Sequence, residues 1–252
     1  MIVLKILGLL IGVIVAFVLL AFIRSLFLIC RRPIRNIYNQ RKEEGHFCNY
    51  YDLPYKTIDF LLAFEDRNFF IHNGYDIQAI KNAFWFNIKS KSIKHGGSTI
   101  TQQLIKNLYF NFDQRFSRKI CELFISIYAE KKLSKIEIIE LYLNVIYYGN
   151  EVYGLYDASL YYFNKRYQDL SVNQIFFLLS FLSAPTAANP YIHPDRFVVL
   201  RNKKVNQVLW LAPDRNFRKT ILNNAIDNLD PELIKRDVDK MNVKMVNEKY
   251  GV

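Results

Sequence analysis

Hydrophobic residues recur along the chain at spacings of three and four, the pattern of helices that bury one face. Residues 58–72 are dense in such positions: Ile58, Leu61, Leu62, Phe64, Phe69 and Phe70. In one continuous helix, Glu65, Phe69 and His72 would share a face, because they lie four and seven residues apart. Only 9 Gly and 7 Pro interrupt the 252 residues, so the sequence predicts a mostly α domain.

Start signals mark the helices that follow this segment. Asp76 is well placed to cap the next helix, and Thr99 with Gln102 fits a capping box at the start of another. In that later helix Thr99, Gln103 and Lys106 form a polar stripe. The stripe begins at a helix N-terminus, where free backbone N–H groups favour phosphate or another anion, and the lysine adds a full positive charge.

The N-terminal region has a different pattern. Residues 6–23 form an unbroken apolar run, and a bilayer core needs about 20 helical residues. A cleaved signal peptide is the alternative, but the run exceeds a usual signal-peptide core and no A-x-A site follows it. We therefore favour an uncleaved anchor with its juxtamembrane segment over residues 1–30, a connector over 31–57 and a folded domain over 58–252.

The composition indicates an anionic binding partner but does not identify which one. A net charge of +11 and a pI near 9.4 suit nucleic acid, an anionic membrane surface or a phosphorylated substrate. The cations are scattered and no nucleic-acid module is visible, so nucleic acid is the weakest of the three. The three cysteines form no C-x-x-C pair, which indicates free thiols rather than a zinc site or a disulfide framework.

Polar residues of the central region match a family pattern. Taken singly, a Glu-Asp pair, a lone histidine or a Gly-Gly-Ser-Thr loop is usually structural. Together, E-D-x-x-F-x-x-H-x-G-x-D from Glu65 and GGSTITQQLIKN from Gly96 resemble the peptidoglycan glycosyltransferases. That family occurs as a module of class A penicillin-binding proteins and as free-standing monofunctional enzymes. R-K-x-x-E from Arg118 resembles its third motif, and the likeness runs from about residue 50 to about 195.

The resemblance implies a fold and a set of roles. The fold is a lysozyme-like helical glycosyltransferase domain with an N-terminal transmembrane helix. The reaction is polymerisation of lipid II, with Glu65 as general base and Glu122 as a second carboxylate. Binding residues at matching positions are Asp66, Phe69, His72, Thr99, Gln103, Lys106, Asn107 and Arg118. Lys106 and Arg118 would stabilise the leaving pyrophosphate, helped by a divalent metal (Mg²⁺ or Mn²⁺) and by no organic cofactor.

Other features set expectations about context. The expected partners are lipid II, the growing glycan strand, the membrane and other cell-wall synthesis proteins, with no nucleic acid. The chain leaves no room for a transpeptidase domain, so a monofunctional form is expected. The chain departs from the family at one position: the family commonly has an arginine where this chain has Gln114, with Arg115 next to it.

Two arguments disagree about the side of the membrane on which the folded domain lies. Basic residues gather after the apolar run, and the positive-inside rule would then place the domain in the cytoplasm. The resemblance instead places it outside the bacterial plasma (inner) membrane, on the periplasmic side. We follow the resemblance, because a large domain can override local charge and a basic cluster beside the membrane can bind lipid phosphates.

Two other classes of function remain open from the sequence. A lysozyme-like hydrolase would also use a glutamate, but it has no need of Lys106 and Arg118 for a pyrophosphate. A catalytically lapsed membrane adaptor of the cell-wall machinery has little use for both Glu65 and Glu122.

Overall fold

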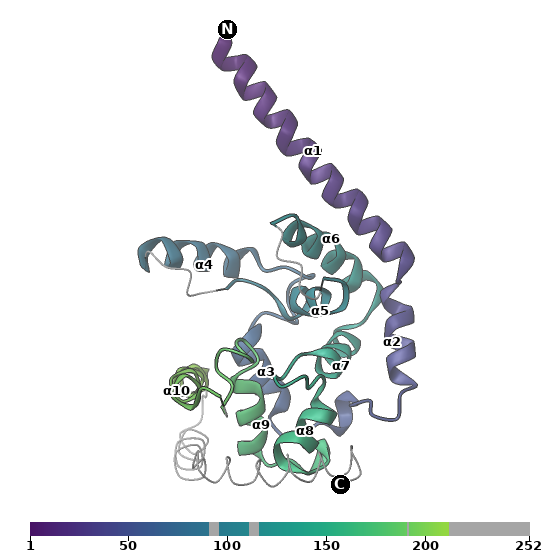
Figure 1. Cartoon of the computed structure of the whole chain (residues 1–252), viewed down its shortest axis with the longest axis vertical. Coiled ribbons are helices and arrows are strands. Elements are labelled where there is room, and N and C mark those ends of the chain that lie inside the picture. The colour runs from purple at the N-terminus through teal and green to yellow at the C-terminus, as the bar shows by residue number, and fades with distance from the viewer. Residues whose placement is uncertain (91–95, 111–115, 191, 212–252) are drawn as a thin grey trace. The chain divides into compact units, whose positions relative to one another are not determined.

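The computed structural model describes residues 1–90, 96–110, 116–190 and 192–211, and these residues are mostly helical (Figure 1). The prediction of a mostly α chain is confirmed, and within the described part the β-structure consists of an isolated bridge between Tyr147 and Tyr153. The chain divides into two compact units. Unit 1 comprises Met1–Gly45 and Asn68–Tyr142, and unit 2 comprises His46–Arg67 and Leu143–Val252.

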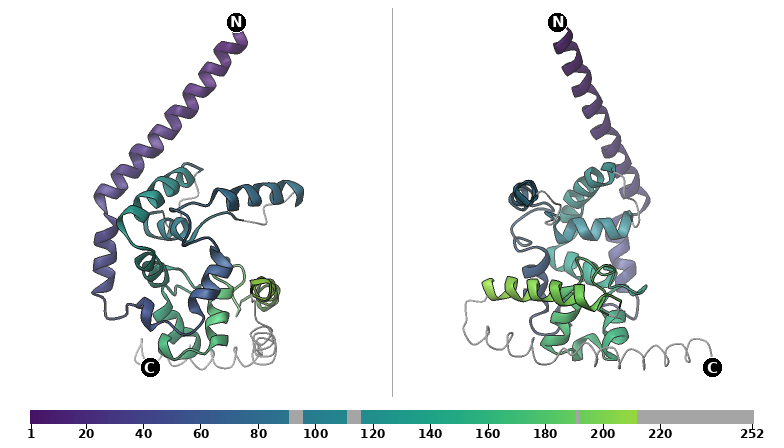
Figure 2. Two further views of the ribbon diagram at one scale, coloured as in Figure 1. Left: turned by 180° about the vertical axis from the view of Figure 1, so that it is seen from behind. Right: turned by 60° about the vertical axis from the view of Figure 1, so that its left-hand side comes forward.

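Unit 1 holds the N-terminal helices and the helices of the central motifs. Its elements are α1 (Ile2–Arg31), α2 (Ile34–Lys42), α4 (Ile77–Ser90), α5 (Ile100–Tyr109), α6 (Phe116–Lys132) and most of α7 (Lys135–Val145). Helix α5 packs on α6 and buries Ile100, Leu104, Ile105 and Leu108. Figure 2 shows α4 extending away from α5 and α6, in keeping with its lack of buried residues.

Unit 2 holds two early helices, one of them a short 3-10 helix, and the helices of the C-terminal half. Its elements are the 3-10 helices η1 (Tyr50–Asp52) and η2 (Tyr167–Asp169), with α3 (Thr57–Glu65), α8 (Leu155–Phe163), α9 (Val172–Ser180) and α10 (Pro194–Leu211). Helix α3 packs on α9 and on α10. Aromatic rings of Phe60 and Phe64 meet Phe176 edge to face at 5.3 and 5.4 Å between centroids, which gives this unit an aromatic core.

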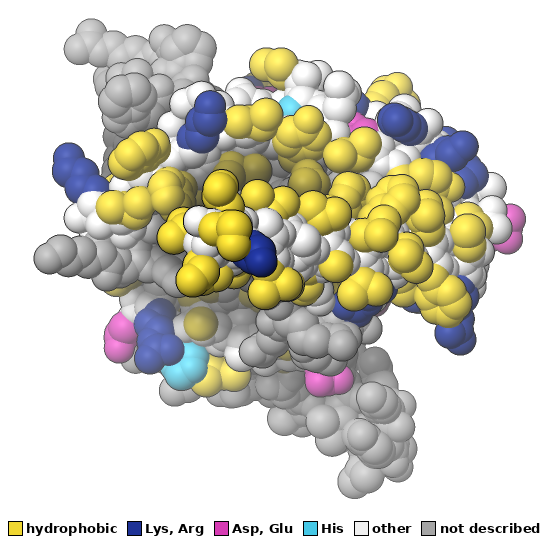
Figure 3. Space-filling model, turned by 90° about the horizontal axis from the view of Figure 1, so that it is seen from above, with side chains coloured by type: hydrophobic (Ala, Val, Ile, Leu, Met, Phe, Trp, Pro, Cys, Tyr) yellow, Lys and Arg dark blue, Asp and Glu magenta, His cyan; other side chains and the backbone are white. Residues whose placement is uncertain are grey.

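Helix α1 is long and apolar enough to cross a membrane. Its first two-thirds expose large hydrophobic side chains, and Figure 3, seen from above, shows many hydrophobic side chains with Lys and Arg among them. Its last third packs on α6, where Cys121 Sγ donates to Ala21 O at 3.3 Å and Phe22 meets Phe124 edge to face. The prediction of an apolar spanning segment agrees with this exposed surface.

The helix predicted over residues 58–72 is shorter than expected. Helix α3 ends at Glu65, and Asp66 N makes the last helical bond, to Leu62 O. The prediction that Glu65, Phe69 and His72 share one helical face is therefore wrong. The chain turns after Asp66, and backbone N–H groups of Ile71 and His72 both donate to Asn68 O. Phe69 is nonetheless fully buried, which explains why the apolar spacing continued past the helix end.

The capping predictions are confirmed. Thr99 and Gln102 form both bonds of a capping box, and Asp76 Oδ1 accepts from Ala79 N at 2.9 Å at the start of α4. Burial disfavours the charged form of Asp76, but hydrogen bonds from Ala79 N and Asn68 Nδ2 outweigh it and lower the pKa of this carboxyl. Residues Gln114 and Arg115 lie outside the described part of the chain.

Candidate active site

Glu65 is the last residue of α3, and its carboxylate is buried in unit 2 with a cation. Lys204 Nζ of α10 lies 3.0 Å from Glu65 Oε1, and both side chains are 5% exposed. Lys204 also donates to Phe64 O at 3.2 Å. An unpartnered carboxylate would be costly to bury here, so the lysine explains how the apolar helix tolerates Glu65. Asp66, the next residue, is also buried.

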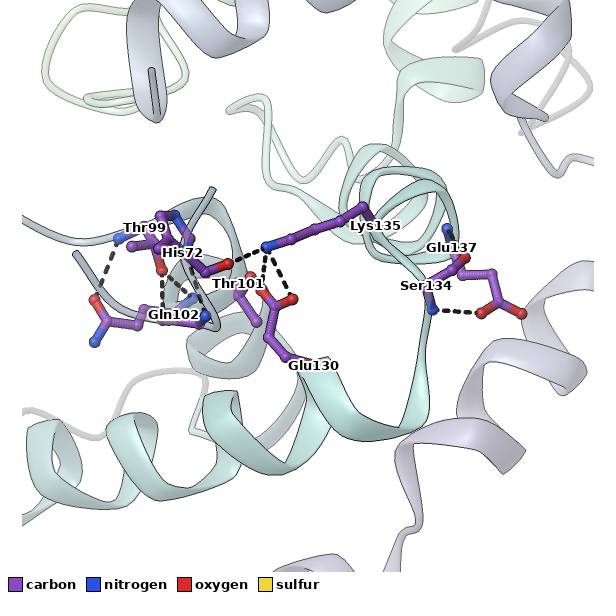
Figure 4. Close-up of polar contacts among 9 residues, drawn as sticks. His72, Thr99, Thr101, Gln102, Glu130, Ser134, Lys135 and Glu137 are labelled. Carbon is purple, nitrogen blue, oxygen red and sulfur yellow. Dashed lines mark hydrogen bonds and ion pairs between the residues drawn. The ribbon is translucent and has the colours of Figure 1, made fainter. Parts of the chain in front are cut away.

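The segment after Asp66 is held in unit 1 by a partly buried polar network (Figure 4). Lys135 Nζ donates to His72 O at 2.7 Å and to Glu130 Oε1 at 2.9 Å, while Thr101 Oγ1 donates to Glu130 Oε1 at 2.6 Å. The ammonium also lies 4.3 Å from the centre of the Phe69 ring. Of the residues predicted to bind substrate, Phe69 therefore supports this segment from within, and the backbone of His72 is fixed by α7.

Gly74 closes the same segment against α6 and α5. Its φ is +94°, and a Cβ at this position would lie 2.9 Å from the backbone of Ser126. Its carbonyl accepts from Thr99 Oγ1 at 2.9 Å, and the same hydroxyl accepts from Gln102 N at 3.1 Å. The Thr99 hydroxyl is thus used to join two motifs, and the side chain is 2% exposed. Its structural role is to fix the start of α5.

Helix α5 carries three of the predicted binding residues beyond its cap. Gln103 Oε1 accepts from Tyr142 OH at 3.2 Å, so Gln103 is anchored to α7. Lys106 and Asn107 follow in the last turn and are half-buried. Asn107 Nδ2 is buried, and no hydrogen-bond partner for it exists among the described residues. A buried amide donor without a partner is costly and is expected to meet a ligand or water.

Helix α6 places two cations on one buried carboxylate. The Glu122 side chain is 1% exposed, with Arg118 Nη1 at 3.1 Å from Oε1 and Lys119 Nζ at 2.9 Å from Oε2. Lys119 Nζ also donates to Ser98 Oγ at 2.7 Å, which links the Gly-Gly-Ser-Thr segment to α6. The Arg118 contact is an ion pair whose alignment falls short of a hydrogen bond, and Arg118 Nε and Glu122 Oε1 both lack a hydrogen bond within the described part.

These groups can bind an anion. Two cations on one buried carboxylate leave a net positive charge, and Arg118 and Asn107 keep N–H groups that no described residue satisfies. A divalent metal fits less well, because the Glu122 carboxylate is already held by two cations. The described residues also contain no group of three or more His, Cys, Asp or Glu side chains that could hold one.

Sequence reasoning missed two residues that support these groups, Lys204 and Glu130. Lys135 begins a stretch that resembles a scaffold element of the family, but its pairing with Glu130 was not predicted. One signal was available for Lys204, since it lies seven residues after Phe197 and four before Val208, both buried positions of α10. A lysine on an apolar helix face is expected to need a buried partner. Glu140 and Asn144 have structural partners. Glu140 Oε2 accepts from Tyr38 OH, and the Asn144 side chain bonds to the backbone N–H and carbonyl of Cys48.

Comparisons with known proteins extend over both units. A model of the transglycosylase family matches residues 31–209. Penicillin-binding protein 1F of Bacillus subtilis is 36% identical over 166 residues, 66% of this chain and 23% of that protein. Penicillin-binding protein 4 of the same species is 42% identical over 143 residues, 57% of this chain and 23% of that protein. Penicillin-binding protein 1A of Pseudomonas aeruginosa is 38% identical over 161 residues, 64% of this chain and 20% of that protein.

The chain thus spans about a fifth to a quarter of the length of these relatives. The matched region contains every residue that the motifs singled out, from Glu65 to Glu122. Because the family model covers most of this chain, the protein belongs to the transglycosylase family, the glycosyltransferase module family of penicillin-binding proteins, as its motifs indicated.

Proposed function

We propose that this protein is a peptidoglycan glycosyltransferase that polymerises lipid II into glycan strands. The observation that carries the proposal is a set of buried polar atoms on α5 and α6. Asn107 Nδ2 and Arg118 Nε have no hydrogen-bond partner among the described residues, and Glu122 Oε1 has only the ion pair with Arg118 there. All three belong to the family's motifs. Buried polar atoms left unsatisfied in this way support a site that is completed by a substrate.

The proposed reaction is an inverting displacement. Glu65 removes the proton from the 4-hydroxyl of the acceptor lipid II, and that oxygen attacks the anomeric carbon of the sugar at the lipid-linked end of the growing strand. A new glycosidic bond forms as the bond from that carbon to the pyrophosphate breaks. Polyprenyl pyrophosphate leaves with the bonding electron pair, and the strand becomes attached to the acceptor. No covalent enzyme intermediate is needed.

The pyrophosphate leaving group gives the cations of unit 1 a role in the proposed reaction. Negative charge grows on the pyrophosphate as its bond to the sugar breaks, and fixed cations stabilise such charge most strongly in a site that excludes water. Arg118 is held in place by Glu122, and Lys106 lies one turn from the end of α5. A divalent metal bound beside the pyrophosphate would supply further positive charge there.

Product analysis tests the function. The full-length protein, solubilised in detergent, is incubated with labelled lipid II, and the products are resolved on a gel. We expect a ladder of glycan strands. No polymer from folded protein would overturn the proposal. Incubation with preformed strands is the second arm, and shortening of these strands would instead indicate a lysozyme-like hydrolase.

We further propose that α1 crosses the bacterial plasma membrane once, with both units on its outer side. The exposed apolar surface of α1 supports the span. The outer side is proposed because the family's lipid-linked substrate presents its sugars there. Cys30 is exposed, whereas Cys48 and Cys121 are buried. A membrane-impermeant thiol reagent should therefore label Cys30 in intact cells whose outer layers are permeable to it, and Cys30→Ser should abolish the labelling. Labelling that occurs only after lysis would reverse the orientation.

A further inference from the structure

The C-terminal helix α10 brings a lysine to the carboxylate that the proposed reaction uses as its base. Lys204 is 4% exposed and lies on the face of α10 that also buries Phe197, Val205 and Val208. Its ammonium is 3.0 Å from Glu65 Oε1, 3.2 Å from Phe64 O and 4.9 Å from the centre of the Phe64 ring. Three separate contacts therefore fix this cation relative to the end of α3.

The contact with Phe64 O ties the lysine to the backbone of α3. Phe64 lies in the last turn of the helix, where carbonyls lack partners within the helix and carry the negative end of its dipole. An ammonium bound there completes the helix terminus. Because the same ammonium binds Oε1, the Glu65 carboxylate is held by its own helix end as well as by α10.

Stability alone is a weak reason for such an arrangement. Both side chains are 5% exposed, so the lysine and the glutamate are both taken out of water. Apolar residues of similar volume often stabilise a fold as well as a buried ion pair does, because the pair loses its hydration. The neighbouring positions of α3 and α10 are occupied by such apolar residues, namely Phe60, Leu61, Val205 and Val208. The charged pair therefore calls for a role in function.

Further polar atoms of α10 lie three residues on either side of Lys204. Arg201 Nε and Gln207 Oε1 are buried and have no hydrogen-bond partner in the part of the chain that the structure describes. A solvated helix face would satisfy such atoms with water. Because these polar atoms are buried beside Lys204 along α10, contact with solvent does not explain why this stretch of the helix is polar. The polar side chains are expected to serve a function instead.

We propose that Lys204 is a positioning residue for Glu65, holding one carboxylate oxygen so that the base meets the acceptor hydroxyl in a fixed orientation. The inference rests on the proposed glycosyl transfer and adds α10 to its machinery. The lysine acts through Glu65, and it transfers no proton and touches no reacting atom. Its loss should therefore lower the rate of the chemical step and leave substrate binding nearly unchanged.

Lys204→Met, compared with Lys203→Met, tests the role. Lys203 is the neighbouring residue on α10 and is exposed, so the control removes the same charge without touching Glu65. Loss of fixed geometry at a reacting group lowers rates by about 100-fold. We expect kcat for lipid II polymerisation to fall by roughly that factor, with KM changed little, and Lys204→Arg to recover part of kcat. A folded Lys204→Met protein with the kcat of the control would overturn the proposal.

Thermal melts of three variants separate positioning from folding. Lys204→Met removes the cation that pairs with the buried Glu65 carboxylate, whereas Lys204→Met with Glu65→Gln removes both charges, so the double variant should melt at the higher temperature. Lys204→Gln keeps a hydrogen-bond donor, and it replaces Lys204→Met in the rate measurement if the methionine variant does not fold. Failure of both single variants to fold would assign Lys204 to the fold alone and overturn the proposal.

The outcomes also distinguish this inference from the function on which it rests. If the wild-type protein makes no polymer, the proposed function fails and the role of Lys204 in it fails too. If the wild type polymerises lipid II and the folded Lys204 variants do so equally well, the function stands and only the positioning role is overturned.

Discussion

Glu65→Gln is expected to lower the rate of lipid II polymerisation by about 10²–10⁴-fold, the usual contribution of a general base. Glutamine has nearly the same shape and keeps an oxygen that can accept a hydrogen bond from Lys204. It cannot take up the proton of the acceptor hydroxyl, so the chemical step loses its base. The measurement is the initial rate of strand formation from labelled lipid II, with products resolved on a gel.

The matched control for this variant is Asp59→Asn. Asp59 lies on the same helix, its side chain is 60% exposed and it pairs with Lys56 at the surface. A surface pair contributes little to stability, so the control should polymerise at the wild-type rate. Glu65→Gln leaves the buried Lys204 without its counter-charge, and its melting curve must show that it folds. A folded Glu65→Gln protein with the wild-type rate would remove Glu65 from the mechanism.

Helix starts were predictable from the sequence because their determinants are local. Thr99 and Gln102 lie three residues apart, and so do Ser134 and Glu137. In the structure each pair forms the reciprocal bonds of a capping box (Figure 4). Asp76 is a similar case, since the backbone N–H of Ala79, which donates to its carboxylate, follows within one turn. Side chains that satisfy a nearby backbone group leave a signature that needs no knowledge of the fold.

The end of α3 was not predictable from apolar spacing. Phe69 and Phe70 continue the helical period, but the backbone turns after Glu65 and Phe69 is buried from that turn. Burial selects an apolar residue whatever the backbone conformation, so the spacing cannot distinguish a helix from a turn packed against the core. The consequence is functional, because Glu65 stands at a helix terminus rather than in the middle of a helix.

At the candidate site, the contacts that the sequence did not predict are mainly those between residues far apart in the chain. Lys204 and Glu65 are 139 residues apart in sequence, and Lys135 and His72 are 63 apart. The motifs mark the residues that are expected to bind substrate, but the groups that hold these residues in place depend on which helices pack together. By contrast, the ion pair on α6 could be predicted from the sequence, because Arg118 and Glu122 lie four residues apart on one helix.

Arg118→Met is the second variant with a large expected effect. Arg118 keeps a buried Nε without a partner among the described residues, and its guanidinium is the group proposed to meet the leaving pyrophosphate. Removing one such preorganised donor costs about 10²–10³-fold in kcat in other enzymes, and we expect a loss of that size in polymerisation. Because Lys119 still pairs with Glu122, the buried carboxylate retains a counter-charge and the variant should fold.

Lys131→Met is the matched control, since Lys131 is an exposed cation in the last turn of the same helix. It removes one positive charge from α6 away from Glu122, and polymerisation should continue at the wild-type rate. Equal rates for Lys131→Met and a folded Arg118→Met would show that Arg118 only neutralises Glu122. A loss confined to Arg118→Met would instead mean that its guanidinium acts on charge formed during the reaction, because Lys119 still neutralises Glu122 in the resting protein.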